Sequence, residues 1–119
     1  MQHGKILITQ RSERMKQPLK WEFPGGKLEP KERLEDAVVR EIREELMIEI
    51  QVTKEFPFYA HHYPDFSLKM YPFEARILSG ELILKEHIAY TWVKPEELEA
   101  YDFSNADIPL MILLKNLAS

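Results

Sequence analysis

Three glutamates, Glu41, Glu44 and Glu45, lie close together in the stretch REIREE at residues 40–45. Positions three and four apart are neighbours on a helix, so the three side chains fall within an arc of about 100°. Each like-charged pair at this spacing costs roughly a few tenths of a kcal/mol. Such a cluster is tolerated either when neighbouring arginines neutralise it or when a divalent cation binds among the carboxylates.

Arg40 and Arg43 are the candidate counter-ions, and a solvated helix face that they neutralise is the plain interpretation of a Glu-rich helix. An acidic residue four positions before a basic one is the favourable order for an ion pair. Asp36 precedes Arg40 in this way, whereas Glu44 follows it. We therefore expect Arg40 to be held on the far side of the helix, which leaves the three glutamates partly uncompensated.

Two glycines precede this helix by a short loop, in the segment WEFPGGKLEP at residues 21–30. Gly25 and Gly26 allow the backbone to come close to a ligand. Oxygen ligands that include several carboxylates suit Mg²⁺ or Mn²⁺, and magnesium commonly binds substrate phosphates as well. The sequence therefore predicts a metal–phosphate site. The P-loop pattern GxxxxGK[ST] does not occur.

The elements that must position this site follow from hydrophobic periodicity. Apolar residues four apart predict a helix over residues 33–47, and further helices are expected over 107–117 and 95–100. Strands are expected over residues 5–9, 19–23, 49–59, 67–78 and 89–93, with an irregularity at Pro72 and a turn at Ser79 and Gly80. This mixture lacks regular βαβ alternation, so we expect an α+β fold or an α/β/α sandwich.

Composition restricts the class of protein. A length of 119 residues suits one domain, and the absence of cysteine excludes disulfides and thiolate metal sites. A net charge of −4 argues against a nucleic-acid polymer as partner. With no apolar run of about 18 residues and no signal-peptide pattern, we expect a cytoplasmic enzyme or binding domain without a membrane partner.

The chain from Gly26 onward resembles the Nudix box: glycine, five residues, glutamate, seven residues, then R-E-apolar-x-E-E-x-G-apolar. The residues that fit in register are Gly26, Glu32, Arg40, Glu41, Ile42, Glu44, Glu45 and Ile48. The stretches WEFPGGK, WVKPEEL and NADIPLM resemble the MutT and CTP-pyrophosphohydrolase branch, so the resemblance covers nearly the whole chain. It implies one Nudix-like hydrolase domain over residues 1–119, an α/β/α sandwich with a mixed central sheet.

The resemblance also implies roles for residues. The ligands of Mg²⁺ or Mn²⁺ would be Gly25 through its carbonyl, together with Glu41, Glu44, Glu45 and Glu86. Arg40 would orient the glutamates through ion pairs, and Glu32 would brace the junction of loop and helix beside Gly26. The implied reaction is hydrolysis of a nucleoside triphosphate to monophosphate and pyrophosphate, and the general base stays open among the glutamates. Candidate nucleotide contacts are Arg11, Phe23, Lys27, Asn105 and Asp107.

The preferred base is open at this stage. MutT-like cleansing of 8-oxo-dGTP is the first expectation, and hydrolysis of CTP or a modified dCTP is the alternative. An ionised Asp107 only accepts hydrogen bonds, which suits the exocyclic amine of cytosine, whereas an amide, such as a nearby Asn105, both donates and accepts. Phe23 can equally be a core residue, and Asp107 can simply cap its helix. A non-catalytic nucleotide-binding Nudix domain and a different Nudix substrate are further alternatives.

The chain departs from the family pattern at two places. Met47 stands where the box has its second glycine, and a left-handed helix end costs a non-glycine residue roughly 1 kcal/mol or more. We expect the strand that the family places before residues 5–9 to be missing. Its loss would uncover a sheet edge and part of the substrate cleft, with reduced stability, edge pairing into a homodimer or weak activity as consequences. Both a monomer and a homodimer therefore stay open.

Overall fold

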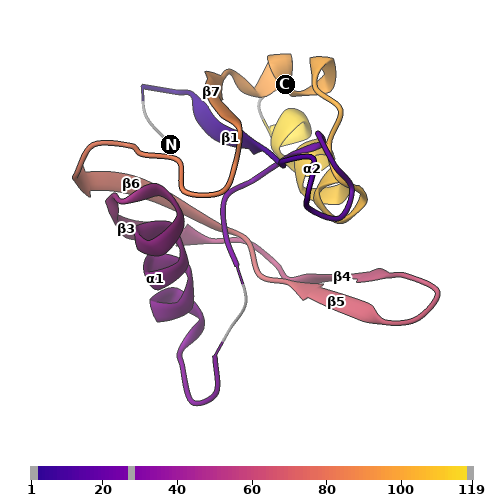
Figure 1. The fold of residues 1–119 in the computed structure, drawn as a ribbon, viewed down its shortest axis with the longest axis horizontal. Helices are drawn as coiled ribbons and strands as arrows, with labels where there is room; N and C mark the ends of the chain where they lie inside the picture. The colour runs from indigo at the N-terminus through magenta and orange to yellow at the C-terminus, as the bar shows by residue number, and fades with distance from the viewer. Residues whose placement is uncertain (1–2, 27–28, 118–119) are drawn as a thin grey trace.

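The protein is described by a computed structural model that covers residues 3–26 and 29–117 (Figure 1). In these described residues, two α-helices and seven strands alternate irregularly, which confirms the α+β class. The elements are β1 (Ile6–Gln10), β2 (Trp21–Glu22), α1 (Leu34–Leu46), β3 (Glu49–Glu55), β4 (Tyr59–His62), β5 (Ser67–Met70), β6 (Phe73–Ser79), β7 (Ala89–Val93), the 3-10 helices η1 (Pro95–Ala100) and η2 (Asn105–Asp107), and α2 (Ile108–Leu117).

The strands form three small sheets in the order β2-β1-β7, β3-β6 and β4-β5, and every strand pair among them is antiparallel. Parallel pairing among the described residues is limited to a bridge between Trp21 and Phe103. In the described residues the expected mixed central sheet is thus divided into three small sheets. One physical reason is proline, which cannot donate to a strand ladder: Pro57 and Pro72 lie where two predicted long strands break into β3 and β4, and into β5 and β6.

The buried side chains gather in two clusters. The first contains Ile8, Val93, Leu98 and Phe103, and α2 packs against it. The second contains Ile42, Leu46 and Ile48, where α1 lies against β3 and β6 (Figure 1). The molecule thus has two halves, one built around α2 and the other around α1. Among the described residues, no helix is long and apolar enough to cross a membrane.

An apolar cavity of about 350 Å³ lies between the two halves. Leu7 and Trp92 line it from the first sheet, and Ile50 lines it from β3. Residues 72–77 line it without a gap, which means that an edge of β6, rather than one face, borders the cavity. Within the described residues β6 pairs only with β3.

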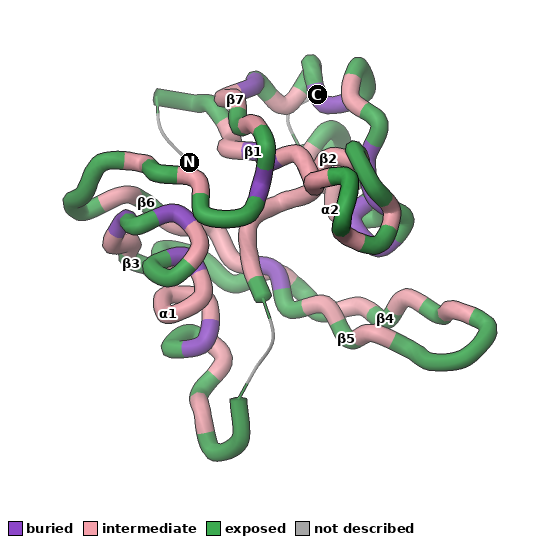
Figure 2. Tube along the Cα trace, in the orientation of Figure 1, coloured by how far each residue is buried: buried purple, intermediate pink, exposed green. Residues whose placement is uncertain are grey.

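The hairpin β4-β5 projects from the body of the molecule, and none of its strand residues is buried (Figure 2). Its base is attached by a hydrogen bond of 2.6 Å from the Tyr59 hydroxyl to the carbonyl of Ala106, just before α2. A second contact joins the Gln17 side chain to the Tyr63 hydroxyl at 3.0 Å. The hairpin is therefore tied to the half that carries α2.

Candidate active site

The C-terminal end of α1 fixes one side of the site. The helix ends at Leu46, and Met47 has φ 61° and ψ 27°. The predicted left-handed helix end is thus confirmed at a non-glycine residue. Gly80 packs directly on it: with φ +99°, its added Cβ would lie 2.8 Å from the Met47 carbonyl oxygen. Glycine at this position lets the segment 80–88 return across the helix end.

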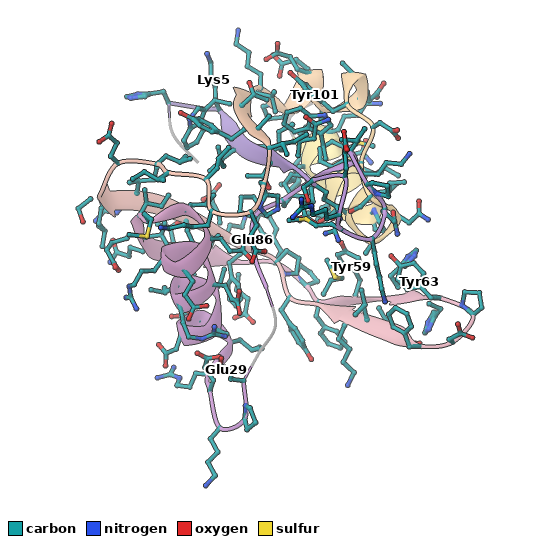
Figure 3. The ribbon with its side chains drawn as sticks, in the orientation of Figure 1. Lys5, Glu29, Tyr59, Tyr63, Glu86 and Tyr101 are labelled. Carbon is teal, nitrogen blue, oxygen red and sulfur yellow. The ribbon has the colours of Figure 1, made fainter. Side chains whose placement is uncertain are left out.

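Segment 80–88 is attached at both ends. The backbone N–H of Lys85 donates to the Glu45 carbonyl at 3.2 Å, and that of Ile88 donates to the Gln10 carbonyl at 3.1 Å. The segment therefore joins the end of α1 to the end of β1. Figure 3 shows Glu86 near the centre of the molecule, between α1 and the half that carries β1 and α2.

Arg40 is the centre of the first group of charges. Its guanidinium donates twice to Glu32, at 2.7 and 3.0 Å, and also to Glu41 at 2.9 Å and Glu44 at 3.1 Å. The two-pronged contact with Glu32 has the geometry that makes arginine–carboxylate pairs strong. Hydrogen bonding to Glu32 raises the pKa of Arg40, and the same contact lowers the pKa of Glu32.

We call Glu32, Arg40, Glu41 and Glu44 the helix cluster. Its geometry corrects one prediction: Arg40 lies on the glutamate side of α1 rather than with Asp36. The physical reason is Glu32, which approaches from the loop before the helix and offers both carboxylate oxygens to the guanidinium. The guanidinium also neutralises part of the charge on Glu41 and Glu44.

Gly26 lies directly beside the Glu41 side chain of the helix cluster. A Cβ at Gly26 would lie 2.1 Å from Oε2 of Glu41, which is far inside van der Waals contact. A Cβ at the neighbouring Gly25 would meet no heavy atom of the described residues within 4 Å. The two glycines therefore differ: the second makes room for a glutamate, and the first leaves its surroundings open.

The second group of charges lies on the inner side of α1, and we call Arg11, Glu22, Glu45 and His87 the inner cluster. The Glu22 carboxylate accepts hydrogen bonds from Nη1 of Arg11 and Nε2 of His87, each at 2.7 Å. The His87 residue is only 9% exposed. Oε2 of Glu45 and Nδ1 of His87 are both buried and have no hydrogen-bond partner among the described residues.

The inner cluster is electrostatically strained at Glu45. Burial raises the pKa of Glu45 to about 7; His87 opposes this rise, while Glu41, Glu22 and Glu86 add to it. Burial also disfavours ionised Glu22, but hydrogen bonds from His87 and Arg11 leave its pKa below the ordinary value. The hydrogen bond to Glu22 in turn raises the pKa of His87. Negative charge is therefore compensated at Glu22 and much less so at Glu45.

Asp107 is buried immediately before α2. Its carboxylate accepts hydrogen bonds from the Ser104 hydroxyl and the backbone N–H of Phe23. Burial raises the pKa of Asp107 to about 6, and nearby Glu22 contributes to the rise. Phe23 itself stacks on Phe103 with ring centroids 5.1 Å apart and borders the core. Asn105 is exposed, and its backbone N–H donates to Gln17 at 2.9 Å.

The structure brings several of the predicted site residues into the two clusters, and it places Phe23, Asn105 and Asp107 together near the start of α2. Glu41 and Glu44 are held in the helix cluster, while Arg11 and Glu45 lie in the inner cluster. Lys27 lies outside the described residues. Glu22 and His87 are the members that sequence reasoning missed. The available signal was position: Glu22 precedes Phe23, and His87 directly follows Glu86.

The donor set of these clusters fits a hard divalent cation. It consists of carboxylate oxygens, and the buried Oε2 of Glu45 lacks a partner while Glu41 and Glu86 repel its charge. A cation such as Mg²⁺ or Mn²⁺ would stabilise that charge. Within the described residues, however, no group of three or more His, Cys, Asp or Glu side chains stands ready to hold a metal ion. Glu41 and Glu44 are engaged by Arg40 instead.

A comparison of the sequence with protein families identifies the family of this chain. The sequence pattern of the NUDIX domain matches residues 1–114. The chain therefore belongs to the Nudix family of hydrolases.

The chain is similar in sequence and structure to characterised members of this family. The chain is 40% identical over 111 residues to the CTP pyrophosphohydrolase of Escherichia coli K12, a match that covers 91% of this chain and 80% of the relative. It is 34% identical over 116 residues to the 8-oxo-dGTP diphosphatase of the same strain, covering 98% and 90%. The solution structure of the E. coli ORF135 protein superposes with a TM-score of 0.84 at 36% identity, covering 99% of this chain and 84% of that one. The Nudix sandwich is thereby confirmed as the fold.

Proposed function

We propose that this chain hydrolyses a nucleoside triphosphate to the monophosphate and pyrophosphate, with Mg²⁺ or Mn²⁺ as cofactor. The observation that carries the proposal is the state of Glu45. It is a buried carboxylate with an unpartnered oxygen and a pKa raised to about 7, and it is close enough to Glu41 and Glu86 for their charges to act on it. The family and both named relatives support the same reaction class.

The glutamates and Arg40 have different tasks in this reaction. Bound divalent metal, held by Glu41, Glu44, Glu45, Glu86 and the Gly25 carbonyl, would neutralise phosphate charge and polarise the phosphorus centre. Arg40 keeps Glu41 and Glu44 in place through its hydrogen bonds. Glu45 is buried beside other carboxylates, which suits a ligand of a divalent cation, and the general base that accepts the attacking water's proton stays open among the glutamates.

The nucleobase of the substrate would lie near Asp107, on the side of the site where Phe23 and Arg11 also lie. With a pKa of about 6, Asp107 is mostly ionised at neutral pH and then only accepts hydrogen bonds. This favours a base edge that carries an amine, as in CTP or a modified dCTP. The second candidate is 8-oxo-dGTP, which also presents N–H groups and is favoured by the 34% identical relative. In that case the enzyme would cleanse the cytoplasmic nucleotide pool and so protect DNA.

The test is a panel of triphosphates with Mg²⁺ that includes CTP, dCTP, 8-oxo-dGTP and dGTP, scored for pyrophosphate. Release from one or more of them supports the proposal, and the ranking of kcat/KM identifies the base. Binding of these nucleotides without any turnover would instead identify a non-catalytic nucleotide-binding domain. Orthophosphate as the only product would contradict the proposed reaction.

The oligomeric state is a separate prediction. Both monomer and homodimer are compatible with the fold, and pairing of exposed strand edges is one route by which two copies would associate. Sedimentation equilibrium decides between them, since a stable monomer at high concentration removes the pairing hypothesis.

A further inference from the structure

We propose that His87 is a positioning residue of the active site, which holds the Glu22 carboxylate between the metal-side glutamates and the base-side Asp107. The inference rests on the proposed triphosphate hydrolysis and adds to it a link between the two sides of the site. Neither His87 nor Glu22 is among the metal ligands or nucleotide contacts assigned above.

The first argument is the geometry of Glu22. This carboxylate is held at both oxygens, by Arg11 on one side and by His87 on the other, with both contacts at 2.7 Å. Its side chain is 17% exposed, and that of His87 is 5% exposed. Hydrogen bonds to an ionised group in such a protected place are short and directional. Glu22 therefore has one preferred orientation, and His87 supplies half of the contacts that define it.

The second argument is the position of Glu22 between two groups of acids. Its charge acts on Glu45 on one side and on Asp107 on the other. A carboxylate that is free to rotate here would change the electrostatic environment of both. By fixing Glu22, His87 keeps the spacing between the acids of α1 and the acid before α2 constant.

The third argument is the attachment of His87 itself. The backbone of its segment is hydrogen-bonded to Glu45 at Lys85 and to Gln10 at Ile88. Those contacts fix the residue between the ends of α1 and β1, with little freedom to move independently of either. His87 is thus built into the junction of the two halves, and Nε2 points to the carboxylate that lies between them.

The experiment uses a pair of polar variants that are expected to fold. In His87→Gln, the side-chain amide nitrogen can occupy the place of Nε2 and donate to Glu22. In His87→Asn, the shorter side chain cannot reach it. We expect His87→Asn to lower kcat/KM for the best triphosphate about 10- to 100-fold, as loss of a residue that orients a site ligand typically does. The kcat/KM of His87→Gln should stay within about threefold of that of the unaltered protein, because the orienting hydrogen bond is kept.

A double-mutant cycle shows whether His87 acts through Glu22. If it does, His87→Asn combined with Glu22→Gln loses no more activity than the more damaging single variant. A loss that multiplies across the two changes would overturn the inference, as would equal activities of His87→Gln and His87→Asn. His62→Asn on the β4-β5 hairpin is the matched control, because His62 contacts only Ser67 in the hairpin among its described hydrogen bonds.

Two further readouts separate a local effect from a failure of the whole proposal. Thermal unfolding should give similar midpoints for the Gln and Asn variants, so that a difference in kcat/KM reflects orientation rather than folding. Mn²⁺ binding without nucleotide, followed by electron paramagnetic resonance, reports on the site independently of turnover, and we expect His87→Asn to weaken it. If the unaltered protein releases no pyrophosphate from any triphosphate, the proposed function fails first.

Discussion

The helix cluster and the inner cluster place similar carboxylates on the same turn of α1 in opposite environments. Glu44 is 58% exposed in its side chain and contacts Arg40, whereas Glu45 is turned inward and has a buried oxygen without a partner. One group is neutralised locally by a cation of its own chain. In the other group, burial and the neighbouring carboxylates leave the charge of Glu45 much less compensated. Adjacent positions in the sequence can therefore have separate physical tasks.

The largest expected effect comes from removing one charge at either position. Glu44→Gln and Glu45→Gln should each lower kcat by orders of magnitude, on the order of 10²- to 10⁴-fold. Their stabilities should differ, because Gln at position 45 relieves a buried charge whereas Gln at position 44 loses only an exposed ion pair. Steady-state pyrophosphate release and thermal unfolding measure the two effects.

This comparison is open to a direct contradiction. Near-normal turnover in both variants would remove the metal role of these glutamates. Equal melting temperatures at pH 8 would show that the environments of the two carboxylates differ less than their burial indicates.

A smaller effect is expected where the loop meets the helix cluster. Gly26→Ala places a methyl group 2.1 Å from Oε2 of Glu41, so that side chain must move away. We expect a loss in kcat/KM of about 10- to 100-fold, comparable to the loss of a residue that orients a ligand. Gly25→Ala is the matched control because its added Cβ meets no heavy atom of the described residues within 4 Å, and it should retain most activity. Comparable losses in both would indicate a general requirement for a flexible loop.

The base side of the site makes a prediction about pH. The pKa of Asp107 is raised from 3.8 to about 6, so the folded state retains a proton that the unfolded chain releases. Its contribution to stability is therefore complete below about pH 4 and is lost as the pH rises through 6. The shift in the pKa of Asp107 from 3.8 to about 6 corresponds to about 3 kcal/mol of folding stability.

Asp107→Asn keeps an acceptor for Ser104 and Phe23 but cannot ionise. In urea unfolding between pH 4 and 7, the free energy of unfolding of the variant should rise relative to that of the unaltered protein as the pH rises, by up to about 3 kcal/mol. Asp65→Asn on the exposed hairpin is the control and should show little change. A constant difference between the Asp107 variant and the unaltered protein over this range would contradict the burial argument.

The sequence predicted the scaffold better than the contacts within the site. Period-four apolar residues predicted residues 33–47 as helix, and α1 covers Leu34–Leu46; the predicted strand over residues 89–93 is β7. Local patterns suffice for such elements. The pair of Glu22 and His87 is separated by 65 positions and has no periodic signature. The side of α1 that Arg40 occupies was also mispredicted, because pairing rules within a helix do not include Glu32 from the preceding loop.

The smallest expected effect concerns the helix end that joins both clusters. Met47 occupies a left-handed conformation with φ 61° and its side chain is largely exposed, so it gives up little packing if it is removed. Met47→Gly should stabilise the fold by roughly 1 kcal/mol or less, since glycine relieves the backbone strain but adds freedom to the unfolded chain. Met47→Ala retains the Cβ and should leave the urea midpoint nearly unchanged. If Met47→Ala stabilises as much as Met47→Gly, the source of the strain is the Met47 side chain and not the backbone. A gain in stability confined to Met47→Gly shows that the left-handed backbone at position 47 is the source.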